Sequence, residues 1–103
     1  MRKVEEYVLE ALKTRTKDNP LLRSDLKVIV GSKDSNARGV IQSLRSQGYR
    51  VCSSAGHKGY WLAESDGDYN AFRTELMSKA NTIYENIKAM DTYLPDQIKM
   101  REI

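Results

Sequence analysis

The sequence predicts a mainly helical α+β protein, in which three short helices and a β-hairpin precede one long C-terminal helix. Three observations support this fold class. Apolar residues recur at helical spacing in three separate segments before residue 48. Two β-prone runs separated by glycines follow, up to residue 62. From residue 65 the helical spacing returns and continues without a break as far as Pro95.

The first two helices are predicted from their apolar faces and from the breakers between them. The first should run from about Arg2 to Lys13, and a polar, turn-prone stretch closed by Pro20 follows it. Its expected buried residues are Val4, Tyr7, Val8, Ala11 and Leu12. Ser24 should cap the second helix, SDLKVIV, and Gly31 should end it in a left-handed conformation. The second helix should bury Leu22 or Leu26 together with Ile29 and Val30.

The third helix completes a helix-turn-helix pattern. Ser32 or Asp34 can cap this helix, which should run to about Gln47 and stop at Gly48. Its expected buried stripe is Ala37, Val40, Ile41 and Leu44. Two short helices that are separated by a turn of three or four residues around a glycine indicate a helix-turn-helix.

After the third helix the spacing changes from helical to extended. The runs YRVCSS and GYWL are short and β-prone, and the five-residue loop AGHKG, residues 55–59, connects them with its two glycines. A hairpin that directly follows a helix-turn-helix forms a wing. The fold predicted for residues 1–63 is therefore a winged helix-turn-helix, three helices plus a β-hairpin wing.

The segment GSKDSNARGVIQSLRSQGYRVCSSAGHKGYWL, residues 31–62, resembles the winged helix-turn-helix domain of the biotin-operon-repressor type. The matching features are Gly31, Leu44–Arg45, Gly48 and Lys58–Gly59–Tyr60–Trp61–Leu62. The resemblance covers about residues 4–63 and implies that Tyr60 and Leu62 face the core. Only a helix follows the wing where the repressor has its ligase domain, so no biotin chemistry is implied. The general size resembles small regulators carried by phages and mobile elements.

Acidic residues are absent from most of this segment. No acid lies between Asp34 and Glu64, although charged residues make up 30% of the chain. Residues 1–62 hold twelve basic and six acidic residues, whereas residues 63–103 hold five and eight. This asymmetry predicts a half that faces nucleic acid and keeps its carboxylates away from phosphates.

The polar side of the third helix supplies most of the candidate DNA contacts. Arg38 suits a guanine edge in the major groove, and Asn36 or Gln42 suits an adenine edge. Gly39 either lets the helix backbone approach the duplex or is simply tolerated on an exposed face. Arg45 could touch phosphate or lie over the core. The predicted DNA-binding residues are Lys33, Ser35, Asn36, Arg38, Gly39, Gln42, Ser43, Arg45, Arg50, His57 and Lys58.

Other chemistries have less support in the sequence. His57 and Lys58 suit the minor groove or backbone beside the wing, and His57 has no cysteine or acid near it in sequence for metal binding or catalysis. Among Tyr60, Trp61 and Leu62, Trp61 is the one serious candidate for stacking on a single-stranded base, and stacking is the less favoured interpretation of this run. Cys52 is predicted to be a small residue on a strand. A single cysteine cannot form an internal disulfide, which indicates a reducing, cytoplasmic setting. No apolar run could span a bilayer. We expect neither an enzyme nor a cofactor.

Residues 64–95 are predicted to form the long C-terminal helix, and residues 96–103 a frayed tail. Ser65 and Asp68 resemble a capping box at its start. The apolar seam of this helix is close to a heptad repeat with one four-residue stutter. Its members are Tyr69, Phe72, Leu76, Ala80, Ile83, Ile87, Met90 and Leu94. The seam either folds back on the domain or pairs with a second copy, and its length favours a homodimer.

These features predict a sequence-specific protein that binds double-stranded DNA. It would be a dimeric transcriptional regulator from a phage or bacterium, reading an inverted repeat with the helix at 34–47 and the wing at 55–59. The alternative keeps the fold and makes it a protein-interaction module or a phage inhibitor of a host nucleic-acid enzyme. A replication-initiation accessory protein is a further option. The absence of acids on the polar face favours DNA.

Overall fold

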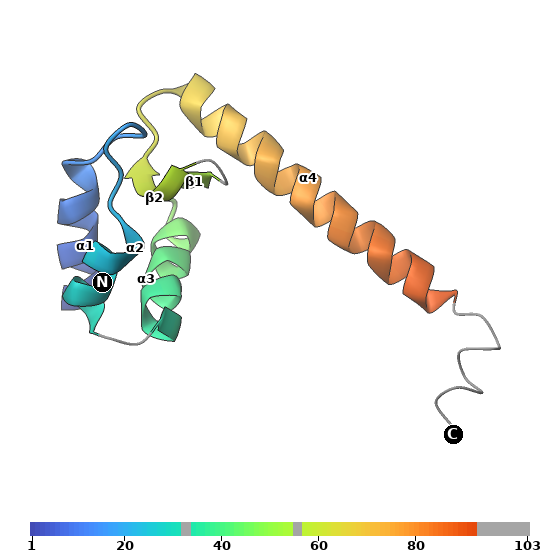
Figure 1. Ribbon diagram of the computed structural model, residues 1–103, viewed down its shortest axis with the longest axis horizontal. Helices are drawn as coiled ribbons and strands as arrows, with labels where there is room; N and C mark the ends of the chain where they lie inside the picture. The colour runs from blue at the N-terminus through green and yellow to red at the C-terminus, as the bar shows by residue number, and fades with distance from the viewer. Residues whose placement is uncertain (32–33, 55–56, 93–103) are drawn as a thin grey trace. The chain divides into compact units, whose positions relative to one another are not determined.

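The computed structural model describes residues 1–31, 34–54 and 57–92, except for the side chains at 34–36, 54, 57 and 58. This part of the chain contains four helices and a two-stranded antiparallel hairpin, which confirms the mainly helical α+β class (Figure 1). The elements are α1 (Lys3–Lys13), α2 (Arg23–Val30), α3 (Asp34–Ser46), β1 (Val51–Ser54), β2 (His57–Leu62) and α4 (Asp66–Asp91).

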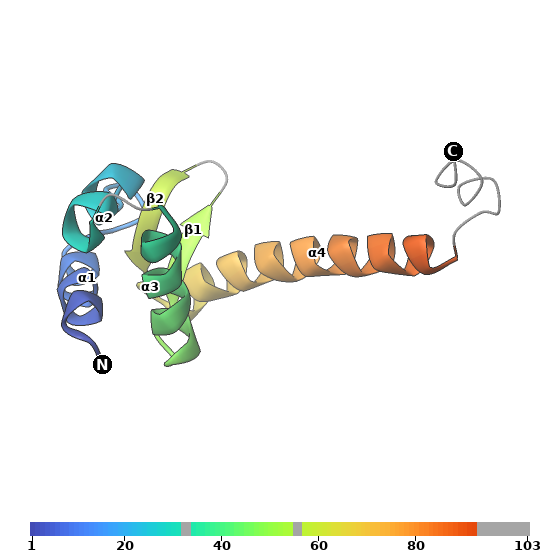
Figure 2. The same cartoon turned by 90° about the horizontal axis from the view of Figure 1, so that it is seen from below.

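The chain divides into two compact units, Met1–Phe72 and Arg73–Ile103. The first unit contains α1, α2, α3, the hairpin and the first turns of α4, and the second contains the rest of α4. Figures 1 and 2 show the three short helices of the first unit grouped together, with the hairpin beside α3.

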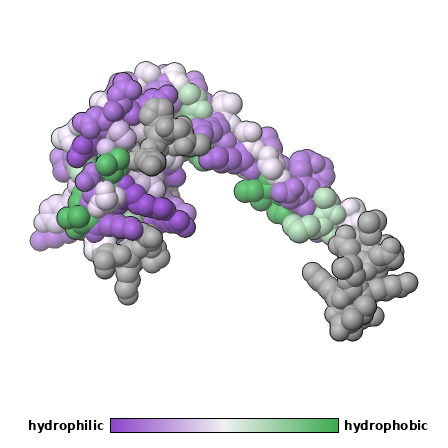
Figure 3. All heavy atoms as spheres, viewed as in Figure 1, coloured by the Kyte–Doolittle hydropathy of each residue, from purple (hydrophilic) through white to green (hydrophobic). Residues whose placement is uncertain are grey.

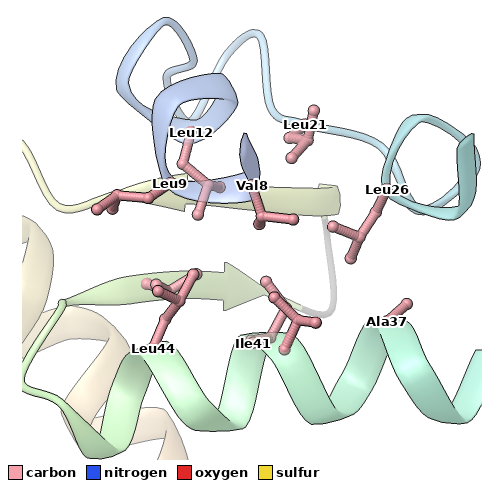
Figure 4. Packing of buried hydrophobic residues seen from close by; sticks show 10 residues of the cluster. Val8, Leu9, Leu12, Leu21, Leu26, Ala37, Ile41 and Leu44 are labelled. Carbon is pink, nitrogen blue, oxygen red and sulfur yellow. The ribbon is translucent and has the colours of Figure 1, made fainter. Parts of the chain in front are cut away.

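The main core of the first unit lies between α1 and α3 (Figure 4). Side chains of the two helices point toward each other across this core, and the hairpin and the segment before α2 close its sides. Its buried members are Val8, Leu9, Leu12, Leu21, Leu26, Ala37, Val40, Ile41, Leu44 and Val51. The stripe predicted for α3 is thus buried in full, because apolar residues at steps of three and four share one helix face.

The buried face of α1 differs from the prediction. Tyr7 is 62% exposed, so its predicted burial is wrong, and Leu9 and Glu5 are buried instead beside Val8 and Leu12. Helical spacing alone accommodates either Tyr7 or Leu9 as a neighbour of Val8. The packing of α1 against α3 selects the smaller apolar side chain and leaves the phenol in water.

The start of α2 also differs from the prediction. Its N-cap is Leu22 and not Ser24. The carboxylate of Asp25 accepts a 3.2 Å hydrogen bond from the Leu22 N–H, which ties this turn together without a serine cap. Of the two alternatives for the core, Leu26 is buried and Leu22 is 43% exposed. Gly31 ends the helix with a positive φ of 95°, as predicted, but its ψ of 172° lies outside the left-handed helical region that was expected.

A third extended segment, which belongs to the connection between α1 and α2, pairs with the hairpin. The pairs within the hairpin are Val51 with Leu62, Cys52 with Trp61, and Ser54 with His57. Leu21 forms an isolated antiparallel bridge to Tyr60, with N···O distances of 2.8 and 2.9 Å. A Cβ at Gly59 would lie 2.6 Å from the carbonyl oxygen of Leu21. Glycine is therefore needed at position 59 for the two backbones to approach this closely.

The loop predicted at residues 55–59 is too long. Strand β2 begins at His57, so residues 57–59 belong to the strand, and residues 55 and 56 lie outside the described residues. Gly59 closes the predicted loop and also opens the β-prone run GYWL. The strand assignment is correct, because Gly59 lies inside β2 and allows the close approach of Leu21.

Helix α4 begins at Asp66, and Ser65 caps it as predicted. The N–H of Asp68 donates a 3.1 Å hydrogen bond to Ser65 Oγ. The other half of the predicted capping box is wrong, because Asp68 Oδ2 accepts instead from Trp61 Nε1 and from the Glu64 N–H, both at 3.1 Å. The helix ends at Asp91, before the predicted end at Pro95, and Thr92 lies in a turn. The predicted tail, residues 96–103, lies outside the described residues.

Candidate nucleic-acid interface

The side of α3 that faces away from the core carries exposed, mostly polar residues. Arg38, Gly39 and Gln42 are exposed. Apart from the backbone of α3 and the two neighbours of Gly39 in the chain, no heavy atom of the described residues lies within 4 Å of a Cβ built on Gly39. The open space at Gly39 leaves both interpretations of this glycine in place. Of the other predicted contacts, all of Lys33 and the side chains of Ser35, Asn36, His57 and Lys58 lie outside the described part of the chain.

The side chain of Ser43 does not point outward with those of Arg38 and Gln42. Its hydroxyl donates a 2.6 Å hydrogen bond to Glu5 Oε1 on α1, so the expected outward placement of Ser43 is wrong. Ser46 Oγ in turn donates to the Ser43 carbonyl oxygen at 2.8 Å, and Gln47 Nε2 donates to the same oxygen at 3.2 Å. Position 43 lies about 100° around the helix from position 42, at the border between the buried and exposed faces. The hydrogen bond to Glu5 on α1 decides which way the Ser43 side chain turns.

Glu5 is the one charged residue that is buried in the described part of the chain, at 4% exposure. Besides Ser43, it accepts a 3.1 Å hydrogen bond from the Arg2 N–H, an otherwise unpaired donor at the helix start. The hydrogen bond from Ser43, followed by that from Arg2, lowers the pKa of Glu5 below the ordinary value of 4.5. The carboxylate is therefore ionised at neutral pH.

Arg45 lies over the core, which is the second of its two predicted alternatives. Its Nε donates a 2.8 Å hydrogen bond to the Val51 carbonyl oxygen, and its guanidinium carbon lies 4.9 Å from the ring centroid of Phe72. Burial lowers the pKa of this guanidinium. Arg45 thus links α3, β1 and the first turns of α4.

Arg50 also has partners within the protein. Its Nη1 lies 2.8 Å from Asp66 Oδ1, and its guanidinium carbon lies 4.1 Å from the ring centroid of Tyr69. The side chain is 50% exposed, so a phosphate could reach it only in competition with Asp66. This geometry assigns Arg50 mainly to the junction between the hairpin and α4.

Trp61 is 2% exposed, so its interpretation as a stacking platform is wrong. It forms a second small cluster with Cys52 and Phe72, on the face of the hairpin opposite to the main core. Tyr60 and Leu62 pack against the main core, as the resemblance implies. Alternation along the strand places Trp61 on the other face correctly, but the first turns of α4 cover that face.

Cys52 is a fully buried free thiol in the same cluster. Burial raises the pKa of this thiol to about 11, and the nearby charge of Asp68 adds to the effect. The thiol is therefore protonated at neutral pH. Its position agrees with the prediction of a small residue on a strand.

The apolar seam predicted on α4 has a packed part and an exposed part. Phe72 is 8% exposed, and Tyr69 is half-buried beneath Arg50. We call the exposed continuation of the seam in the second unit the α4 seam: Leu76, Ala80, Ile83, Ile87 and Met90. Its residues follow steps of four and three, the spacing of a coiled-coil heptad. Figure 3 shows apolar side chains gathered on α4, while Leu94 lies outside the described residues.

Two residues with important contacts have weak sequence signals. Glu5 stands between Val4 and Val8 in the apolar pattern of α1, and an acid in that position was the available signal for a buried carboxylate. The sequence pattern predicts a capping role for Asp68, but the hydrogen bond from Trp61 to Asp68 depends on how the strand and the helix meet. Sequence spacing does not contain that information.

Comparisons with protein-family models, with curated proteins and with solved structures find no match to this chain. Within residues 1–31, 34–54 and 57–92, no helix combines the length and the apolar character needed to cross a bilayer.

Proposed function

We propose that the chain is a sequence-specific protein that binds double-stranded DNA through a winged helix-turn-helix domain. The order of α2, α3 and the hairpin supports this fold, because α2 ends at Val30 and α3 begins only four residues later, at Asp34. The bridge between Leu21 and Tyr60 supports it further, because it attaches the segment before α2 to the wing. The observation that carries the proposal is the two-sided character of α3. It buries one full apolar stripe and exposes Arg38 and Gln42, in a segment free of acids after Asp34.

In this proposal α3 lies in the major groove, which is wide enough to admit one helix. Arg38 and Gln42 are four residues apart, so they project from the same side of α3, about 5–6 Å from each other. With a rise of about 3.4 Å per base pair, they would read neighbouring base pairs. Arg38 would donate to O6 and N7 of a guanine, and Gln42 would pair with N6 and N7 of an adenine. Lys58 and His57 at the start of β2 would contact the adjacent backbone or minor groove.

Contacts within the protein remove three residues from the set of candidate DNA-binding residues. Ser43, Arg45 and Arg50 each have a partner within the protein at 2.6–2.8 Å, so their first role is structural. The candidates that remain are Lys33, Ser35, Asn36, Arg38, Gly39, Gln42, His57 and Lys58.

The α4 seam supports the dimeric form of this proposal. Its apolar side chains are exposed in the single chain, from 42% for Leu76 to 66% for Met90, and their heptad spacing suits pairing with a second copy. Two recognition helices related by a two-fold axis would read an inverted repeat. We propose that such a dimer acts as a transcriptional regulator in the cytoplasm of a bacterium, encoded by the cell or by a phage.

One observation favours a second candidate function. Met77 and Tyr84 lie beside the α4 seam and are 47% and 60% exposed, so the apolar face is wider than the seam of a two-stranded coil. A wide apolar face suits a larger protein partner. In this second reading the chain is an interaction module, such as an inhibitor of a nucleic-acid enzyme or a replication-initiation accessory protein.

The first test is selection of bound duplexes from a randomised DNA pool at several salt concentrations, combined with light scattering of the free protein. Enrichment of an inverted repeat together with a dimeric mass would support the regulator. Weak, salt-labile binding without an enriched motif would instead support the interaction module.

The role of the α4 seam needs a separate pair of variants. Ile83→Lys should give a monomeric mass and lose the preference for the inverted repeat, while binding to a single half-site remains. Thr82→Lys adds the same charge on the neighbouring, polar side of α4 and serves as the matched control. A dimeric mass for Ile83→Lys would contradict pairing through the seam.

A further inference from the structure

We infer that Glu5 and Ser43 form a positioning pair that fixes the rotation of α3 about its own axis, and with it the direction of the base-reading residues. The inference rests on the proposed function and assigns a specificity-determining role to a contact inside the protein. The two residues are 38 positions apart, and their 2.6 Å hydrogen bond joins α1 to α3. Neither residue needs to touch DNA for this role.

The apolar stripe of α3 does not by itself determine this rotation accurately. Its buried residues are Ala37, Val40, Ile41 and Leu44. Burial of such residues is favourable but not directional, and an apolar stripe covers at least about 100° of the helix surface. A hydrogen bond to a carboxylate is shorter, stronger and directional. Because Glu5 is buried, rotation of Ser43 away from it would leave a charge without one of its donors, which is costly.

Both partners are held in place on their other sides. Glu5 Oε2 accepts the Arg2 N–H at 3.1 Å, and the Arg2 side chain lies 3.4 Å from Glu5 Oε1. Ser43 Oγ accepts a 3.2 Å hydrogen bond from Gln47 Nε2, one turn further along α3. The carboxylate is thus anchored at the start of α1, and the hydroxyl is oriented by its own helix. The pair therefore acts as a fixed link between the two helices.

A small rotation of α3 would matter for base recognition. The ends of side chains at the surface of a helix lie about 5–6 Å from its axis, so a rotation of about 20° moves them by about 2 Å. Hydrogen bonds to base edges do not survive a displacement of this size. Contacts between flexible cations and phosphates tolerate it better. Loss of the pair should therefore reduce base recognition by Arg38 and Gln42 more than it reduces non-specific binding.

The first experiment compares Ser43→Ala with Ser46→Ala, the same substitution in the same helix. Among the described contacts, the Ser46 hydroxyl donates to the backbone carbonyl oxygen of Ser43 within α3 and not to another element. Affinities for the selected duplex and for a random duplex are measured at a temperature at which both variants are fully folded. Ser43→Ala should lower the ratio of the two affinities by about tenfold, within the range of one lost base contact. Ser46→Ala should leave the ratio within twofold of the wild type. An unchanged ratio for Ser43→Ala would overturn the inference.

A second experiment needs no DNA. NMR relaxation dispersion of the α3 amides detects microsecond-to-millisecond motion of the helix. Ser43→Ala should show such exchange along residues 38–46, and the wild type and Ser46→Ala should not. Flat dispersion in all three proteins would show that α3 keeps its rotation without the pair and would overturn the inference. If the wild type selects no DNA motif, the proposed function fails, while this measurement still decides whether Glu5 and Ser43 position α3.

Discussion

Trp61 Nε1 lies 3.1 Å from Asp68 Oδ2, and this hydrogen bond joins strand β2 to the first turn of α4. The same oxygen accepts a hydrogen bond from the Glu64 N–H at 3.1 Å. One carboxylate therefore binds both strand β2 and the segment that connects β2 to α4. Phe72 packs beside Trp61 from the next turn of the helix. The start of α4 is therefore part of the first folded unit and not a separate appendage to it.

Asp68→Ala should lower the free energy of unfolding by about 1–3 kcal/mol, because a buried indole N–H and a backbone N–H both lose this acceptor. Trp61 is the only tryptophan in the sequence, so its fluorescence in a urea titration reports the change. Asp66→Ala is the matched control. Its ion pair with Arg50 is solvent-exposed and should contribute less than about 1 kcal/mol. Equal losses in the two variants would contradict the importance of the Trp61 bond.

Gly59→Ala should destabilise the fold by about 1–3 kcal/mol, since the new methyl group would lie 2.6 Å from the Leu21 carbonyl oxygen. The bridge between Leu21 and Tyr60 would have to open or shift. Gly39→Ala is the control, because its surroundings are open and alanine favours a helix by up to about 1 kcal/mol. Thermal unfolding of the two variants should shift in opposite directions. Weaker DNA binding by the more stable Gly39→Ala would indicate that the helix backbone approaches the duplex there.

Arg38→Ala should weaken binding to the selected duplex by on the order of 1–3 kcal/mol and relax the base preference at one position. Lys58→Ala should weaken binding to all duplexes alike and reduce the salt slope by about one unit. Both variants are measured by salt-titrated binding, with Lys13→Ala on α1 as a control far from both positions in sequence. Equal effects of Arg38→Ala on selected and random DNA would rule out base reading by this residue.

The stability of the protein should fall as the pH drops below about 5, and Glu5 should contribute to that loss. Its pKa is lower in the folded state than the ordinary value of 4.5, mainly because of the hydrogen bond from Ser43. The stabilisation is therefore complete above the unfolded value and disappears as the pH falls through the folded pKa. Urea titrations between pH 3 and pH 7 measure this dependence.

Glu5→Gln should flatten this pH dependence, because the amide does not titrate. Glu10→Gln on the exposed side of α1 is the control and should follow the wild-type curve more closely. A Glu5→Gln variant with the full wild-type slope would place the acid-sensitive group elsewhere.

The periodicity of apolar residues predicted the type and order of every element in the described part of the chain. It succeeded best for α3, where all four predicted stripe residues are buried. It failed at Tyr7, because two positions of α1 satisfy the same spacing and only packing against α3 distinguishes them. The turn signal failed at Gly59, because glycine marks close backbone approach as well as loops.

The candidate interface was predicted only in outline. Residue type and helical spacing placed Arg38 and Gln42 on the exposed face correctly. The same reasoning grouped Ser43, Arg45 and Arg50 with them, since each is polar and lies near the predicted surface. Their partners are Glu5 on α1, Val51 on β1 and Asp66 on α4. Polar side chains at the border between buried and exposed surface can turn either way, so partners on other elements decide their roles.

The sequence by itself determined the fold class, the apolar face of α3 and the absence of acids between residues 34 and 64. These properties depend on local spacing and composition, which the chain carries before it folds. Only the tertiary structure decided that Trp61 is covered, that Ser43 turns toward α1 and that two of the arginines serve the α4 junction. These outcomes depend on which surfaces meet, and a directional hydrogen bond or a buried ring has a partner only once those surfaces are in contact.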